Sequence, residues 1–203
     1  MGLDLWARFR YHGDNDLGTG DRTGMIIIRS AVPADGSRLA QIYRYYVENT
    51  AVSFEYVAPD AAEFRSRIER TLANYPYLVL EEDGVILGYA YAGPFKARAA
   101  YARSAELSIY LDSAARGRGL GARLYEALEA EMAARGFLNL YACIADPVTE
   151  DEYLTRGSER FHQRMGFARA GSFRRCAFKF GRWYNMIWME KLIGEHKEEC
   201  PWQ

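Results

Sequence analysis

A strand, a glycine-rich loop and a helix follow one another without a spacer in the segment YLDSAARGRGLGARLYEALEAEM, residues 110–132. The first N–H groups of a helix lack internal partners and sit at the positive end of the helix dipole, so a phosphate group fits there. Glycine lets the backbone approach a ligand closely, and arginine pairs well with phosphate. The segment therefore predicts an anion-binding loop, and a tight turn without any ligand is the simpler alternative.

Strand and helix patterns alternate along the rest of the chain. Asp35 and Asp60 are expected to cap two helices, and Asp83-Gly84 lies between two β runs as the turn of a hairpin. Gly136 is expected to end the long helix, and Gly181 to lie in the turn of a last hairpin. The order is strand, helix, helix, three strands, helix, strand, helix and two strands. This order predicts an α/β fold with one mixed sheet and helices on its faces.

Length and composition predict one domain and exclude several classes of protein. We expect a loose N-terminal extension over 1–24, a single domain over 25–193 and a charged tail over 194–203. The formal net charge is −1, which gives no electrostatic case for binding nucleic acid or a membrane, and no apolar run is long enough to span a bilayer. The three cysteines are widely spaced without a C-x-x-C pair, which favours a reducing, cytoplasmic location and no metal.

Two common phosphate-binding motifs do not account for the glycine-rich loop. The chain has no G-x-x-x-x-G-K-[ST] string. Gly117, Gly119 and Ala122 formally match the dinucleotide pattern G-x-G-x-x-A, but that pattern belongs to an early βαβ unit with an acidic residue about 20 positions further on. Here the loop lies in the middle of the chain, and Asp146 is too distant and precedes a proline.

A third motif matches better. Arg116-x-x-Gly119-x-Gly121 resembles the R/Q-x-x-G-x-G/A signature of the GCN5-related N-acetyltransferases (GNAT). Within that superfamily, the stretch 25–193 is similar to the phosphinothricin acetyltransferase group, through the strings IYRYYVENTAVSFEY, AYAGPFKARAAY, AELSIYLD, FHQRMGF and YNMIWMEK. The resemblance implies an acyl-CoA N-acyltransferase fold with a mostly antiparallel central sheet, acetyl-CoA as cofactor, a small-molecule amine as substrate and a homodimer.

The same resemblance implies where the acetyl donor binds and which group removes a proton. Glu106 stands at the position of the catalytic glutamate and would act as general base, although a solvated glutamate at the start of a strand is the simpler interpretation. Strand 106–111 is expected to separate from the next strand and to offer backbone N–H groups to the oxyanion. The cofactor-binding residues implied are Ile109, Tyr110, Leu111, Arg116, Gly117, Arg118, Gly119, Leu120, Gly121 and Ser158.

The proton donor and the acceptor site are also implied by the resemblance. His162 would protonate the leaving thiolate or relay a proton to it, and a structural histidine is the alternative. Lys96 and Arg98 would pair with the anionic groups of a small amino acid, while Phe54 and Tyr101 would form walls of its pocket. The alternative is that Lys96 and Arg98 are ordinary surface residues of a solvated loop and bind no substrate.

Two departures from the family pattern leave the acceptor open. Thr155 occupies a place where the superfamily often has asparagine, and the segment 146–157 is longer than in similar chains. Its acidic stretch Glu150-Asp151-Glu152 keeps a polyamine or aminoglycoside acceptor as an alternative, beside a peptide amine. A third alternative is an acyl-CoA-binding sensor without catalytic activity.

Overall fold

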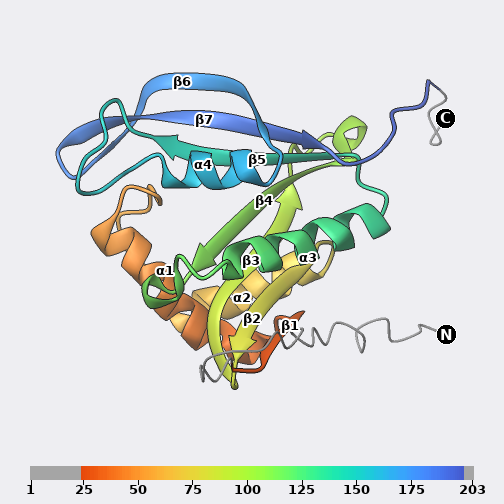
Figure 1. The fold of residues 1–203 in the computed structure, drawn as a ribbon, viewed down its shortest axis with the longest axis horizontal. Helices are drawn as coiled ribbons and strands as arrows, with labels where there is room; N and C mark the ends of the chain where they lie inside the picture. The colour runs from red at the N-terminus through yellow and green to blue at the C-terminus, as the bar shows by residue number, and fades with distance from the viewer. Residues whose placement is uncertain (1–23, 199–203) are drawn as a thin grey trace, which may run out of the picture.

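The computed structural model describes residues 24–198, and the element order predicted from the sequence is confirmed (Figure 1). The predicted extension over 1–24 therefore lies outside the described residues except for Gly24, and the predicted tail is described only to residue 198. The strands are β1 (Ile26–Ser30), β2 (Tyr77–Glu82), β3 (Val85–Pro94), β4 (Ser104–Leu111), β5 (Asn139–Asp146), β6 (Ala168–Lys179) and β7 (Arg182–Leu192). The α-helices are α1 (Gly36–Asn49), α2 (Ala61–Leu72), α3 (Leu120–Ala134) and α4 (Gly157–Arg164).

The strands form one sheet in the order β1-β2-β3-β4-β5-β7-β6. All neighbouring strands run antiparallel except β4 and β5, which are parallel because the helix α3 connects them. The mixed, mostly antiparallel sheet is thus the predicted one. The parallel pair lies in the middle of the sheet, where β4 and β5 visibly diverge (Figure 1).

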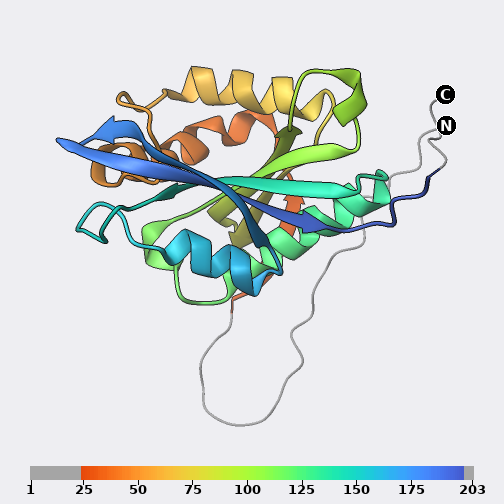
Figure 2. The ribbon, with the colours of Figure 1, turned by 90° about the horizontal axis from the view of Figure 1, so that it is seen from above.

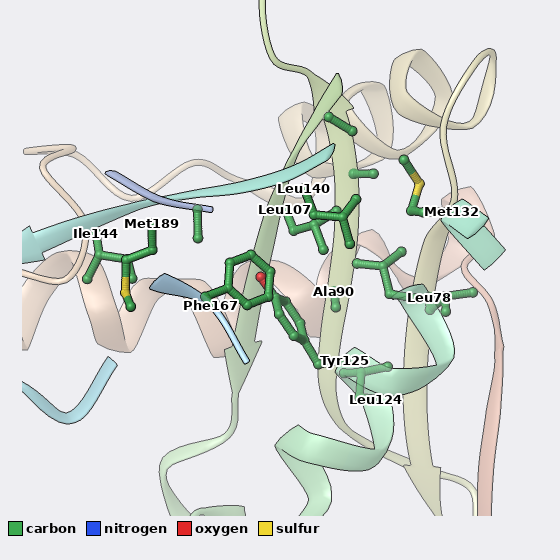
Figure 3. Close-up of a cluster of buried hydrophobic side chains, with 14 of the residues drawn as sticks. Leu78, Ala90, Leu107, Leu124, Tyr125, Met132, Leu140, Ile144, Phe167 and Met189 are labelled. Atoms are coloured by element: carbon green, nitrogen blue, oxygen red, sulfur yellow. The ribbon is translucent and has the colours of Figure 1, made fainter. Parts of the chain in front are cut away.

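Helices cover both faces of the sheet, with α1 and α2 on one side and α3 and α4 on the other (Figure 2). On the α3 side, Leu124 and Tyr125 pack with Leu107 of β4 and Leu140 of β5 in the larger buried cluster (Figure 3). On the α1 side a tyrosine-rich cluster contains Tyr43, Tyr46, Phe64, Tyr77 and Tyr89. Successive residues of β4 point to opposite faces, so this strand contributes to both layers.

Most of the local sequence signals form as expected. The side chain of Asp60 accepts a hydrogen bond from the Glu63 N–H at 2.8 Å, which caps α2. Asp83 and Gly84 have φ of 50° and 82°, the positive values that a two-residue hairpin turn requires. Asp35 is the N-cap residue of α1, as expected, but its side chain makes no hydrogen bond to the first turn of the helix. Its carboxylate binds Arg29 and the Val32 N–H instead, so it ties the start of the helix to β1.

No helix among residues 24–198 has both the length and the apolar character needed to cross a bilayer. Within the same residues, no group of three or more His, Cys, Asp and Glu side chains is placed to hold a metal ion.

Candidate active site

The glycine-rich loop joins the end of β4 to the first turn of α3, and its backbone faces open space. Gly117 and Gly119 have φ of 77° and 75°, and a Cβ atom placed on either would meet no atom within 4 Å. Gly119 is the N-cap residue of α3. Asp112, just before the loop, accepts a hydrogen bond from the Ala114 N–H at 2.9 Å and one from Arg38 at 2.6 Å. A rigid start and two left-handed glycines thus leave the helix N-terminus accessible to an anion.

A cleft of about 860 Å³ runs from this loop along α1, α3 and α4. Eight of the ten residues predicted to bind the cofactor line it: Ile109, Leu111, Arg116, Gly117, Gly119, Leu120, Gly121 and Ser158. The other two are placed differently. The ring of Tyr110 packs against Tyr43 on the opposite face of the sheet, and the Arg118 guanidinium donates to Glu82 at 3.0 Å. These two residues could contact a ligand in the cleft through their backbone.

Two tyrosines of α1 that the sequence analysis missed shape the wall of the cleft. The Arg116 guanidinium lies over the rings of Tyr45 and Tyr46, at 5.0 and 4.9 Å from their centroids. The Tyr46 hydroxyl donates to the Leu111 carbonyl at 2.7 Å and accepts from the Leu111 N–H at 3.0 Å. Tyr46 therefore fixes both the arginine and the end of β4. Tyr46 belongs to the ordinary apolar stripe of the helix and Tyr45 is exposed beside it, so no local signal marks either as part of a binding site.

The strands β4 and β5 separate next to Glu106, as the resemblance implied. Their pairing is limited to Ser104–Glu106 with Asn139–Tyr141, whereas β5 continues to pair with β7 as far as Asp146. On the side that faces β5, residues 107–111 therefore have no partner strand. A cavity of about 60 Å³ occupies this gap, and it shares Val52, Ile109, Leu154 and Ser158 with the large cleft. The cleft thus continues into the sheet as far as strand β4.

Glu106 is the last residue of β4 that pairs with β5, and it is only partly exposed. Burial raises the pKa of the Glu106 carboxyl above its ordinary value, and the positive charge of Lys96 opposes this. The raised pKa makes Glu106 a stronger base than an exposed glutamate.

The predicted acceptor residues lie in two places. Lys96 has its ammonium over the rings of Phe95 and Trp188, at 4.9 and 5.3 Å from their centroids. Tyr101 contacts the same Phe95 ring at 5.8 Å, and Arg98 is exposed between them in the sequence. Phe54 lies in the segment after α1, where its ring centroid is 6.3 Å from that of Tyr184. The first three residues thus lie on one loop, after β3, and Phe54 lies on another.

His162 lies on α4, is 4% exposed and borders the gap between β4 and β5. Its Nδ1 is 2.8 Å from the Ser158 carbonyl oxygen, and its Nε2 is 3.1 Å from the Tyr125 hydroxyl. A carbonyl only accepts, so Nδ1 carries the proton and Nε2 accepts from Tyr125. Burial lowers the pKa of His162 and raises that of Tyr125 well above its ordinary value. The imidazole is therefore neutral at pH 7, and Nε2 is the nitrogen that can accept a further proton.

The long acidic segment after β5 is neutralised by arginines. Glu150 accepts from Arg160 at 3.2 Å, and Arg182 donates to both carboxylate oxygens of Glu152 at 2.8 Å. Asp151 is 3.0 Å from Arg182 and also accepts from Tyr184. Thr155 lines the cleft, and its hydroxyl accepts from the Gly157 N–H at 3.3 Å. Because these carboxylates have cationic partners already, the segment is a poor site for a polycationic amine.

A mixed sheet that opens at its central parallel pair, beside an anion-binding helix start, defines the acyl-CoA N-acyltransferase class. The family model described as an acetyltransferase (GNAT) domain matches residues 28–188. The chain belongs to this family and is an acetyl-CoA-dependent N-acetyltransferase.

Curated relatives and a solved structure support this assignment. The chain is 35% identical over 159 residues to the phosphinothricin N-acetyltransferase of Streptomyces viridochromogenes, covering 78% of this chain and 83% of the relative. It is 32% identical over 170 residues to the L-methionine sulfoximine/L-methionine sulfone acetyltransferase of Salmonella typhimurium, covering 83% and 95%. The crystal structure of a Sinorhizobium meliloti phosphinothricin acetyltransferase in complex with acetyl-CoA matches with a TM-score of 0.78 and 35% identity, covering 87% of this chain and 92% of that one.

The loop conformation gives a first prediction, for Gly119→Ala. An alanine in the left-handed region costs about 1–2 kcal/mol, so the loop would move toward other conformations. We expect the KM for acetyl-CoA to rise about tenfold while kcat at saturation changes little, as steady-state kinetics would show. Gly84→Ala is the matched control, because Gly84 also has a positive φ of 82° in open space, but in the turn between β2 and β3. An equal KM increase in both variants would contradict the prediction.

Proposed function

We propose that this chain transfers the acetyl group of acetyl-CoA to the primary amine of a small amino acid or amino-acid analogue, of the phosphinothricin or methionine sulfoximine type. The amine attacks directly in a ternary complex. One observation carries the proposal: the partly buried Glu106 lies where β4 and β5 separate, paired with the end of β3 and close to Lys96 of the cationic, aromatic loop that follows it. The names of the two relatives above supply the substrate class.

Acetyl-CoA would supply the activated acetyl group, and the described residues fit it. The left-handed glycines and the N-terminus of α3 suit the pyrophosphate, with Arg116 beside them. The narrow gap suits the pantetheine arm, because the unpaired edge of residues 107–111 offers it hydrogen-bonding groups. Ile109, Leu111, Leu120 and Ser158 supply further wall of the cleft, and Thr155 contributes to it where the family often has asparagine.

Glu106 would act as the general base. An α-amino group is largely protonated at pH 7, and only the neutral amine attacks the thioester. A carboxylate with a raised pKa takes up that proton, directly or through a water molecule, more readily than an exposed glutamate would. Backbone N–H groups along the unpaired edge of β4 would stabilise the oxyanion, since they lie in a buried and confined place.

The remaining roles follow from the positions of the side chains. Lys96 and Arg98 would pair with the carboxylate and any second acidic group of the acceptor, with Phe54 and Tyr101 as apolar walls. His162 would relay a proton to the leaving thiolate: its Nε2, released from the Tyr125 hydroxyl, would accept the proton that Glu106 takes from the amine and give it to the sulfur, while Nδ1–H stays bonded to the Ser158 carbonyl. Peptide, polyamine and aminoglycoside amines are the alternative acceptors, and the arginine-neutralised acidic segment disfavours the last two.

The test of this function is thiol release from acetyl-CoA, followed with a thiol-reactive dye against a panel of amines. The panel contains phosphinothricin, methionine sulfoximine, methionine sulfone, the common amino acids, spermidine and kanamycin. We expect turnover with amino acids or their analogues only. Turnover confined to spermidine or kanamycin would contradict the proposed acceptor. Absence of turnover, with acetyl-CoA still raising the melting temperature, would favour the acyl-CoA-binding sensor.

We also propose a homodimer in the cytoplasm. The aromatic side chains of Phe173, Phe178 and Trp183 on β6 and β7 are 46–55% exposed, which suits a surface that a second copy covers. Sedimentation at micromolar concentration would show a dimer, and a monomer would contradict the proposal. The cytoplasmic location rests on the sequence prediction alone.

A further inference from the structure

Lys179, at the end of β6, is a buried lysine that the proposed mechanism does not use. The residue is 3% exposed, although lysines are almost never fully buried without partners. Its Nζ donates to the backbone carbonyl oxygens of Thr50 at 2.9 Å and of Ser53 at 2.6 Å. The ammonium also lies 5.0 Å from the centroid of the Phe180 ring. The two carbonyl oxygens and the ring face take the place of the water that solvates an exposed ammonium. A buried charge needs such partners.

The two carbonyls belong to one short segment without regular structure, residues 50–55, which follows α1. Side chains fix the segment from within: the Thr50 hydroxyl donates to the Tyr46 carbonyl at 2.7 Å, and the Ser53 hydroxyl is 2.7 Å from that of Tyr43. A backbone bond from the Ala51 N–H to the Tyr153 carbonyl, 3.0 Å long, joins the segment to the loop after β5. Lys179 therefore supplies the hydrogen bonds that tie this segment to the hairpin of β6 and β7.

The segment 50–55 also reaches the proposed active site. Val52 lines both the large cleft and the gap between β4 and β5. Phe54 follows one residue after the carbonyl of Ser53 that Lys179 binds, and its ring is placed beside Tyr184 of β7. A shift of the Ser53 carbonyl would change the direction in which the Phe54 side chain leaves the backbone. The position of Phe54 thus depends on a contact made by a side chain that lines neither the cleft nor the gap.

We propose that Lys179 is a positioning residue for the amine acceptor: by binding the carbonyls of Thr50 and Ser53, it holds the segment 50–55 so that Phe54 forms a wall of the acceptor pocket. This inference rests on the proposed function for its substrate, and it assigns Lys179 no contact with that substrate. Thr50 and Ala51, at the cleft end of the segment, keep their bonds to Tyr46 and Tyr153 without the ammonium, so we expect its removal to change acceptor binding, through Phe54, more than acetyl-CoA binding.

The kinetic test uses Lys179→Met, which keeps the length of the side chain and removes its donors. We expect the KM for the amine that the wild type acetylates best to rise at least about tenfold, because Phe54 is then no longer held in place. The KM for acetyl-CoA is expected to stay within about twofold. Lys179→Gln keeps two N–H donors and is expected to restore part of the acceptor affinity, which a purely apolar packing role would not produce. If Lys179→Met does not fold, the same two KM values are compared between Lys179→Gln and the wild type.

Lys191→Met is the matched control. Lys191 is a partly buried lysine of β7 whose Nζ donates to Glu129 at 2.6 Å and lies 5.8 Å from the Phe167 ring centroid. Its removal also destabilises the fold, but it holds no part of the segment 50–55. An equal rise of the acceptor KM in the two methionine variants would overturn the inference, and so would an unchanged acceptor KM in Lys179→Met.

Amide hydrogen exchange tests the same contact without any turnover. The amides of Ala51, Val52 and Glu55 are hydrogen-bonded in the structure, to Tyr153, Thr50 and Ser53 respectively. We expect faster exchange in the peptide covering 50–56 for Lys179→Met, and unchanged exchange there for Lys191→Met. Exchange equal to that of the wild type would overturn the inference. The exchange experiment needs no turnover, so its result is independent of the proposed function. If the wild type acetylates no amino acid on the panel, the proposed function is wrong.

Discussion

Replacing Glu106 by glutamine is expected to lower kcat by about 10²- to 10⁴-fold, the usual effect of removing a general base. Glutamine has nearly the same shape, so the end of β4 and its pairing with Tyr141 should persist. The amide cannot take up the proton of the attacking amine at any pH. Initial rates of thiol release at saturating acetyl-CoA and acceptor measure the effect, and circular dichroism shows whether the variant is folded.

Glu131→Gln is the matched control for this prediction. Glu131 lies on α3 and pairs with Arg135 one turn further on, at 2.8 Å. Such an i, i+4 pair on a helix surface contributes little to stability, and nothing connects it to the cleft. We expect its kcat to equal that of the wild type. If Glu106→Gln keeps a similar rate, another group removes the proton and the role proposed for Glu106 is wrong.

The pH dependence tests the same residue independently. A general base works in its ionised form, so the rate falls as the pH drops through the pKa of Glu106. Burial raises this pKa, so the acidic limb of the kcat/KM profile is expected above the range of an exposed glutamate. In Glu106→Gln the limb should disappear while the residual rate persists. A limb of unchanged position in that variant would assign the titration to another group.

Leu128→Ala is expected to lower the free energy of unfolding by about 2–5 kcal/mol. Leu128 is 0% exposed on the buried side of α3 and belongs to the cluster that joins α3 to both halves of the sheet. Truncation leaves a cavity there that the surrounding strands can fill only in part. For a domain of this size the melting temperature should fall by roughly 5–20 °C, which thermal or denaturant unfolding would measure.

Leu128→Met provides the control, because a swap that nearly conserves volume costs less than about 1.5 kcal/mol. Below its melting temperature, Leu128→Ala should keep its KM for acetyl-CoA, since the cleft is lined by residues of the first turns of α3 and not by Leu128. If the melting temperature of Leu128→Ala is no lower than that of Leu128→Met, the surrounding side chains fill the space that the truncation leaves. The prediction would then be wrong.

Hydrophobic periodicity and turn residues were sufficient to predict the order of the elements. The stripes of α1 and α2, the turn at Asp83-Gly84 and the end of α3 at Gly136 each depend on residues close together in the sequence. Asp35 shows the limit of such local reasoning, because it is the N-cap residue of α1 and yet its side chain makes no capping hydrogen bond. Its carboxylate would have capped α1, but a guanidinium from β1 offers two charge-assisted hydrogen bonds, which are stronger than a cap.

The candidate site was predictable only where a family motif marks it. The motif identifies the glycine-rich loop and the strand of Glu106, and the structure brings them to one cleft and one gap. Tyr46 and Lys179 act through contacts with residues 65 and more than 120 positions away, and no motif in the sequence marks either contact. Tyr125 likewise looks like a core residue of α3 until its hydroxyl is seen beside His162. Contacts of this kind depend on the packing of the whole sheet.

The limited pairing of β4 with β5 also has a mechanical consequence. The two strands are joined by three residue pairs, so the sheet resembles two leaves, β1–β4 and β5–β7, on a short hinge. Glu106 is the last residue of that hinge, at the point where the leaves part. A change of twist within either leaf alters the width of the opening beside the carboxylate, even when it touches no residue of the cleft. Substitutions at the outer strands can therefore reach the reacting groups through the geometry of the hinge.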